Sequence, residues 1–172
     1  MKSINRFLDR RDYPYIAIVT VLGFVNHFLY NWTGHSSVIA LFCPVNESVW
    51  ENLKLLFFPF LFVSVLAYLR RRSIRSVFFY QRLLAVLSGM AAIIVPFYTY
   101  TGIIGRSFLP LDILIYLFGV LTAFSFLKYI RKKHSSSAPS DSTIIIAWLF
   151  LCLCFFFFTG FPPNIPLFFS AQ

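Results

Sequence analysis

The sequence has very little charge: only 12% of its 172 residues are Asp, Glu, Lys or Arg, and just six of them are acidic. A soluble domain has a charged fraction of about 25%. With 59% hydrophobic residues and a mean hydropathy of +0.76, the chain is far more apolar than such a domain, and no separate soluble domain fits. The composition predicts an integral membrane protein.

Cysteine is also scarce, and its spacing indicates no metal or redox centre. Cys43, Cys152 and Cys154 form no Cys-x-x-Cys pair and have no nearby His to complete a zinc set. We expect small buried hydrophobic residues here, with a Cys43–Cys154 disulfide as the alternative. The sequence has no His-Glu-x-x-His motif and no internal repeat of the kind that inverted-repeat transporters have.

Five apolar runs are long enough to cross a bilayer, which takes about 20 helical residues. The spans are predicted at about residues 14–32, 48–69, 77–100, 109–129 and 143–160. The predicted fold is an all-α, polytopic transmembrane helical bundle that forms one domain over residues 1–172. The apolar stretch 37–45 is too short to cross, so we expect a re-entrant or an interfacial segment.

Basic residues cluster at residues 2–11, 70–75 and 128–133, all on one side of the predicted bundle. By the positive-inside rule the N-terminus is cytoplasmic, and five spans then place the C-terminus outside. The net charge of +9 comes mostly from these clusters beside the spans. The expected partner is therefore membrane lipid and not nucleic acid, and the predicted location is the plasma membrane.

The other polar residues of the spans gather toward the predicted outer ends of the first four. A charged side chain inside a bilayer costs roughly 2.5–3.5 kcal/mol on insertion scales, so such residues usually face a protein interior or a water-filled cavity. We therefore predict a polar binding pocket on the extracytoplasmic side. Its candidate residues are His27, Asn46, Glu47, Glu51, Lys54, Tyr98, Tyr100, Arg106 and Asp112.

Three charged residues stand out at the start of the second span. Glu47, Glu51 and Lys54 are predicted to form one stripe, because residues three and four apart share a helix face. Neighbouring carboxylates beside a Lys are an arrangement that acid–base chemistry or proton transfer uses. The alternative is structural: Ser48-Val49-Trp50-Glu51 matches a capping box, and Lys54 would pair with Glu51 within the helix.

His27 and Asp112 leave a similar choice open. A His within a span needs a partner, so His27 either makes an interhelical hydrogen bond or acts as a ligand or proton acceptor. Asp112, just after Pro110, lies where an acid stabilises the first turn of a helix. With Glu47 and Glu51 they would offer nitrogen and oxygen ligands to a divalent ion, but the spacing matches no metal motif. No metal site is predicted, and the cofactor stays unassigned.

Three passages resemble a known family: residues 23–34, residues 42–55, and residues 97–105 with Leu111-Asp112-Ile113. The segment Pro-Val-Asn-Glu-Ser-x-Trp-Glu from Pro44 is the specific part. The chain resembles a family of small multi-pass bacterial membrane proteins of unknown function over roughly residues 15–130. Similar members often have Glu in place of Asn31 and His in place of Asn52. The resemblance implies a helical protein of the plasma membrane of a Gram-positive bacterium and implies no activity.

The sequence thus predicts a small binding or transport-accessory protein whose outer pocket takes a lipid headgroup, an ion or a partner span. The alternative is an intramembrane hydrolase or transferase that acts on outer-leaflet lipid. In that case Glu51 or Glu47 would be the general base, and Lys54 or Arg106 would contact phosphate. A purely structural polar network is the third possibility.

Overall fold

The computed structural model describes residues 7–70, 75–133 and 138–169, and within these ranges it contains helices and turns but no β-strand. The long helices are α2 (Tyr13–Trp32), α4 (Val49–Arg70), α5 (Arg75–Ile104), α6 (Leu109–Lys133) and α7 (Asp141–Gly160). The short ones are η1 (Arg10–Asp12), α3 (Ser37–Phe42) and η2 (Pro166–Phe168).

Each long helix of the described chain is long and apolar enough to cross a membrane, which confirms the predicted all-helical fold with five candidate spans. The predicted span ends lie close to the helix ends. The largest differences are at the ends of α5, predicted at 100 and found at 104, and of α6, predicted at 129 and found at 133.

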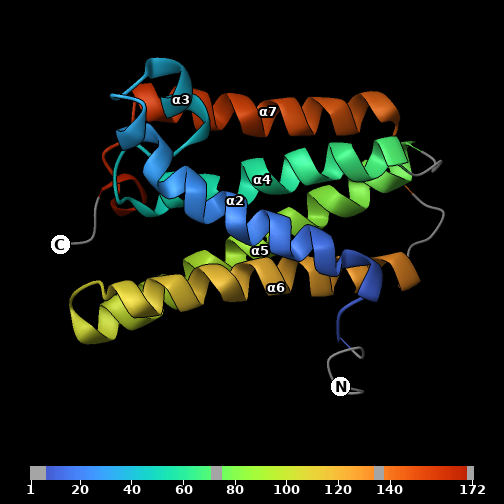
Figure 1. Cartoon of the computed structure of the whole chain (residues 1–172), viewed down its shortest axis with the longest axis horizontal. Helices are drawn as coiled ribbons and strands as arrows, with labels where there is room; N and C mark the ends of the chain where they lie inside the picture. Colours follow the sequence, from blue (N-terminus) through green and yellow to red (C-terminus); the bar gives the residue numbers. More distant parts are fainter. Residues whose placement is uncertain (1–6, 71–74, 134–137, 170–172) are drawn as a thin grey trace.

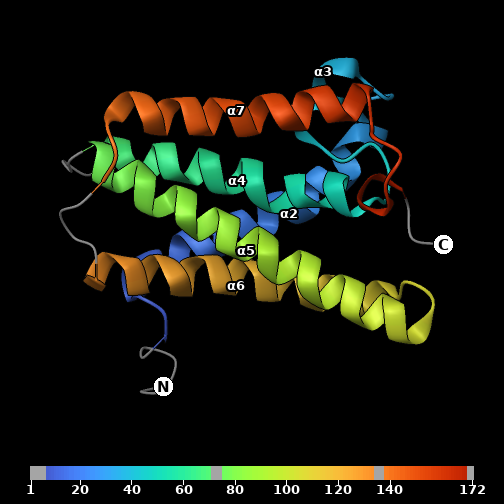
Figure 2. The same ribbon diagram turned by 180° about the vertical axis from the view of Figure 1, so that it is seen from behind.

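The long helices run side by side, with α4 and α7 along one side of the bundle and α6 along the other (Figure 1). The view from behind shows α5 crossing obliquely between α4 and α6 (Figure 2). We call the end of the bundle that holds α3 and the α5–α6 turn the α3 end, and the opposite end, which holds η1, the η1 end. α4 has the largest buried share of the long helices and forms the centre of the core.

Two glycines allow α5 and α6 to cross closely. A Cβ on Gly89 would lie 2.8 Å from the carbonyl oxygen of Gly119, and a Cβ on Gly119 would lie 3.0 Å from the carbonyl oxygen of Gly89. Small residues at such crossings let the backbones of membrane helices approach. Gly119 and Ala123 form a small-xxx-small pair, which is the signal for this contact in the sequence.

Charged groups at the η1 end connect the N-terminal segment to α6. Arg131 Nη1 donates to Asp12 Oδ2 at 2.6 Å, and Lys128 Nζ donates to the carbonyl oxygen of Leu8 at 3.0 Å. Asp12 is completely buried by this arrangement. Arg10 and Arg11 of the first basic cluster therefore lie at the same end of the bundle as the basic residues of α6, whereas Lys2 and Arg6 fall outside the described residues.

The apolar stretch 37–45 forms the short helix α3, followed by Cys43 in an extended conformation. α3 lies beside the C-terminal end of α7 at the α3 end of the bundle (Figure 1). All the cysteines are free thiols, so the alternative of a Cys43–Cys154 disulfide is wrong.

Candidate functional site

The predicted polar pocket is two separate sites in the structure, on different faces of α4. The enclosed network lies between α3, α4 and α7 and consists of Lys54, Glu51, Thr159 and the backbone of residues 40–45. The open pocket lies between α2, α4, α5 and α6 and contains His27, Glu47 and Asp112.

In the enclosed network the ammonium of Lys54 has no exposed surface and is surrounded by acceptors. It donates to Glu51 Oε2 at 2.8 Å, to the carbonyl oxygen of Ala40 at 2.8 Å and to Thr159 Oγ1 at 2.6 Å, with the Cys43 carbonyl oxygen at 3.4 Å. An ammonium has three N–H donors, so every proton has an acceptor. The predicted pairing of Lys54 with Glu51 within the helix is confirmed.

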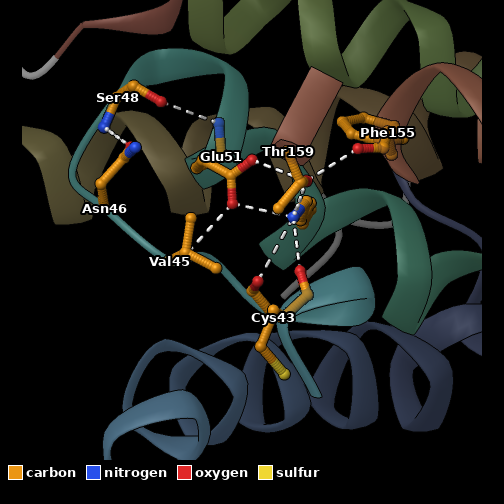
Figure 3. Close-up of polar contacts among 9 residues, drawn as sticks. Cys43, Val45, Asn46, Ser48, Glu51, Phe155 and Thr159 are labelled. Carbon is orange, nitrogen blue, oxygen red and sulfur yellow. Dashed lines mark hydrogen bonds and ion pairs between the residues drawn. The ribbon is translucent and has the colours of Figure 1, made fainter. Parts of the chain in front are cut away.

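The carboxylate of Glu51 is likewise surrounded by hydrogen-bond partners (Figure 3). Its Oε2 also accepts from the backbone N–H of Val45 at 3.0 Å, and its Oε1 lies 3.0 Å from Thr159 Oγ1. The residue is only 2% exposed. Three contacts and 2% exposure leave this carboxylate little surface for a substrate to reach, so the arrangement supports architecture and not base catalysis by Glu51.

The capping signal at the start of α4 is also confirmed, with one change. Ser48 Oγ accepts from the backbone N–H of Glu51 at 3.3 Å, as in a capping box. The N–H of Ser48 donates instead to Asn46 Oδ1 at 2.9 Å, so the Glu51 side chain reaches back to Val45. Asn46, predicted in the binding pocket, is therefore part of the helix cap (Figure 3).

The predicted stripe of Glu47, Glu51 and Lys54 is wrong for its first member. α4 begins at Val49, so Glu47 precedes the helix and does not share a face with the other two. Glu47 lies in the open pocket, and its side chain is 69% exposed.

The open pocket has a volume of about 260 Å³ and mostly apolar walls. Its lining side chains come from four of the long helices and from the segment before α4. They are Gly23, Phe24, His27, Phe28, Glu47, Val49, Asn52, Leu55, Ile93, Phe97, Leu109, Asp112, Ile113, Ile115 and Tyr116. None of these described lining residues is a Lys or an Arg.

Two carboxylates and an imidazole face this pocket. His27 Nε2 lies 3.7 Å from Glu47 Oε1, a distance that is long for a hydrogen bond. Asp112 Oδ1 accepts a hydrogen bond from the Tyr100 hydroxyl. The same hydroxyl oxygen accepts from the backbone N–H of Phe108 at 3.1 Å, so its own proton is directed at Asp112.

Asn52 is a lining residue that sequence reasoning missed. Its side-chain oxygen is buried and accepts a hydrogen bond from none of the described residues. Buried polar atoms normally have a partner, and leaving one unpaired costs about 1–3 kcal/mol. The family resemblance indicated Asn52 only as a position where similar members often have His, so its amide was not predicted to line the pocket.

Tyr116 closes the deep end of the pocket and was also missed. Its hydroxyl donates to the carbonyl oxygen of Val19 at 3.0 Å and lies 3.5 Å from the carbonyl oxygen of Leu55. This contact requires Gly23, because a Cβ there would meet the Tyr116 hydroxyl and would lie 2.8 Å from the Leu55 oxygen.

The polar side chains of the lining lie toward one end of the pocket. On α2, His27 lies one turn nearer the α3 end than Gly23. On α4, Asn52 lies nearer that end than Leu55, and on α6 Asp112 lies nearer it than Tyr116. We call this end of the pocket its mouth; the apolar Phe28, Val49 and Leu109 line it as well.

The remaining predicted residues lie outside both sites. Tyr98 is 37% exposed and does not line the pocket. Arg106 is exposed in the α5–α6 turn and does not line it either. Within the described ranges no three His, Cys, Asp or Glu side chains lie close enough together to hold a metal ion. Glu51 belongs to the enclosed network, so the four metal-capable side chains considered from the sequence do not meet.

The fold places the protein in the class of helical proteins with five candidate membrane spans. Within that class, the chain belongs to the family described as "Family of unknown function (DUF6512)", which matches residues 3–172. Comparison with curated proteins gave no match, and neither did comparison with solved structures. The family match covers both polar sites.

Proposed function

We propose that the protein is a plasma-membrane protein that binds the headgroup of a membrane lipid in the open pocket, from the extracytoplasmic side. The observation that carries this proposal is a mostly apolar pocket whose polar side chains His27, Asn52 and Asp112 lie toward the α3 end. A lipid has its polar headgroup at the membrane interface and its apolar chains below it. A mostly apolar pocket with polar groups toward one end matches such a molecule better than it matches a free ion.

The size and rim of the pocket agree with a headgroup. Its volume of about 260 Å³ is slightly below the roughly 300–1,000 Å³ of typical small-molecule sites, so it suits a headgroup and not a whole lipid. Phe28, Leu109 and Ile113 line the pocket and are exposed hydrophobic residues of α2 and α6. Acyl chains attached to a bound headgroup can therefore remain in the bilayer beside α2 and α6.

The proposed orientation has the N-terminus in the cytoplasm and the α3 end outside. It is supported by the basic residues at the η1 end, among them Arg131 and Lys128, because positive charge beside spans stays on the cytoplasmic side. A fluorescent protein fused to the N-terminus is expected to fluoresce, and alkaline phosphatase fused to the C-terminus is expected to be active. The opposite pattern would overturn the orientation and with it the extracytoplasmic assignment.

Binding is a better match to this geometry than hydrolysis or transfer of lipid. Lys54 and Glu51 are buried and bonded to each other, so neither is available as a phosphate contact or a base. Arg106 is not a lining residue, so Glu47 would have to act without a cationic partner in the pocket. The enzymatic alternative therefore lacks the side chains that it needed.

Two neighbouring substitutions on α6 test the proposal. Ile113→Trp adds bulk to a lining residue, whereas Leu114→Trp adds the same group to an exposed residue that does not line the pocket. Native mass spectrometry of the purified full chain measures tightly bound lipid. We expect Ile113→Trp to lose that lipid and Leu114→Trp to keep it. Equal occupancy in both variants and the unmodified protein would sink the proposal.

A further inference from the structure

We infer that the headgroup held in the open pocket ends in an ammonium group, so that the protein selects amine-bearing lipids over anionic ones. This inference rests on the proposed function, and it specifies the chemistry of the bound headgroup. It is carried by the charge and the hydrogen-bonding capacity of the residues at the mouth of the pocket.

The mouth of the pocket has an excess of negative charge. Glu47 and Asp112 contribute two carboxylates, and His27 contributes at most one positive charge. The mouth is therefore negative in either protonation state of His27 when both carboxylates are ionised. The nearest basic side chains on the sequence, Lys54 and Arg106, do not line the pocket.

The chain has few acidic residues, and two of those outside the pocket already have cationic partners. Glu51 is paired with Lys54, and Asp12 is paired with Arg131. Asp112 has no Lys or Arg within ion-pair distance among the described residues, and Glu47 has only His27. A bound cation would form an ion pair with these two carboxylates, as Lys54 does with Glu51.

The mouth also has more acceptors than donors. The buried oxygen of Asn52 accepts no hydrogen bond from the described residues, and ionised carboxylates can only accept. A primary ammonium offers three charged N–H donors, whereas a phosphodiester brings only oxygen acceptors and each glycerol hydroxyl offers a single uncharged donor. The aromatic rings of Phe24, Phe28 and Phe97 add faces that attract a cation.

Lipids that differ only in the headgroup provide the test. The purified full chain in detergent is titrated with phosphatidylethanolamine, phosphatidylcholine and phosphatidylglycerol of identical acyl chains, and occupancy is read by native mass spectrometry. All three carry the phosphate, so the comparison isolates the terminal group. We expect phosphatidylethanolamine to bind about tenfold more tightly than phosphatidylglycerol, the size expected for one charge-assisted hydrogen bond. Phosphatidylcholine, which has a cation without N–H donors, is expected in between.

Three variants show where any preference arises. Glu47→Gln and Asp112→Asn should each reduce the preference for phosphatidylethanolamine severalfold, since each removes one negative charge from the mouth. Arg106→Gln is the matched control, because it removes an exposed charge at the same end of the bundle and outside the lining. It should leave the preference unchanged.

The outcomes separate the two proposals. One outcome is that phosphatidylglycerol binds as tightly as phosphatidylethanolamine or more tightly, and that Ile113→Trp still abolishes binding. This result overturns the ammonium assignment and leaves headgroup binding standing. If all three lipids bind and Ile113→Trp does not weaken their binding, both the ammonium assignment and headgroup binding in this pocket are overturned. Glycerophosphoethanolamine, the headgroup without acyl chains, should bind at least tenfold more weakly than the lipid. Equal affinity would show that the ligand is a free amine and not a lipid.

Discussion

The enclosed network and the open pocket lie at the same end of the bundle, contact the same helix and each contain carboxylates, yet they differ in how their polar groups are satisfied. In the network, Lys54 and Glu51 bond to each other and to neighbouring backbone and hydroxyl groups, and both are buried. In the pocket, Glu47 is largely exposed, and the buried side-chain oxygen of Asn52 has no partner in the part of the chain that the structure describes. Charge inside a membrane bundle therefore indicates a binding site only where its partners are incomplete.

Lys54→Met gives the largest expected effect on this comparison. Removing the ammonium leaves Glu51 as a buried charge without its main partner, and breaking a buried ion pair costs about 3–5 kcal/mol. The free energy of unfolding, measured by SDS titration in detergent, should fall by that amount. Lys132→Met, at an exposed position on α6, is the control and should change it by less than about 0.5 kcal/mol. Equal stability of both variants would mean that the network is not structural.

Cys43 reports on the same network without a stability measurement. Burial raises the pKa of this thiol, and Lys54 beside it opposes the shift only in part. In a chain with Cys152 and Cys154 replaced by Ser, maleimide should label Cys43 slowly, because the thiol is 2% exposed and mostly protonated at neutral pH. Labelling should accelerate in Lys54→Met. Rapid labelling of the unmodified network would contradict its enclosure.

Thr159→Val is the next largest perturbation. The substitution keeps the shape of the side chain and removes the hydroxyl that contacts both Lys54 and Glu51, so the unfolding free energy should fall by about 1–3 kcal/mol. Thr101→Val is a close control, because both hydroxyls bond to the carbonyl four residues earlier and the Thr101 hydroxyl bonds to no other helix among the described residues. Similar losses in the two variants would show that the network adds nothing beyond the local bond.

Tyr116→Phe tests the base of the open pocket. It removes the hydrogen bond to the Val19 carbonyl and leaves the ring in place, so about 0.5–1.5 kcal/mol of stability should be lost in the SDS titration. Lipid occupancy should persist, because the polar mouth is intact. Loss of all bound lipid in this variant would move the recognition of the ligand from the mouth to the base.

Glu47→Gln gives the smallest effect on stability and the sharpest contrast with Lys54→Met. The side chain is 69% exposed and lies outside the helix, so the unfolding free energy should change by less than about 0.5 kcal/mol. Lipid selectivity should change in this variant as described above. A loss comparable with that of Lys54→Met would show that both sites are structural.

Much of the fold was predictable because long apolar runs and flanking basic clusters are direct consequences of crossing a bilayer. The capping box and the Lys54–Glu51 pair were predictable for a similar reason, since both are local along one helix. The contacts of Lys54 with Thr159 and of Tyr116 with Val19 join residues about 100 positions apart. No periodicity within one span indicates which residue of another span it faces.

The residues predicted to form one pocket are divided by the start of α4. Because this helix begins at Val49, Glu47 precedes it and lies beside α2 and α6, while Glu51 in its first turn contacts Val45 after α3 and Thr159 of α7. Helix starts are the least certain feature of a sequence-based assignment, and here the start decides which carboxylate belongs to which site.

The hydrogen bonds of α7 have a consequence for its position along its own axis. This helix is the most apolar of the spans and buries little of its surface, so its packing alone distinguishes poorly between neighbouring offsets along its axis. Trp148 Nε1 donates to the Phe79 carbonyl oxygen at 3.3 Å, and Thr159 joins Lys54 three turns away. A slide of one helical turn, about 5.4 Å, would break both bonds at once. Two polar contacts thus set the register of a helix whose other contacts, such as those of Phe155 with Trp50 and Phe57, are apolar.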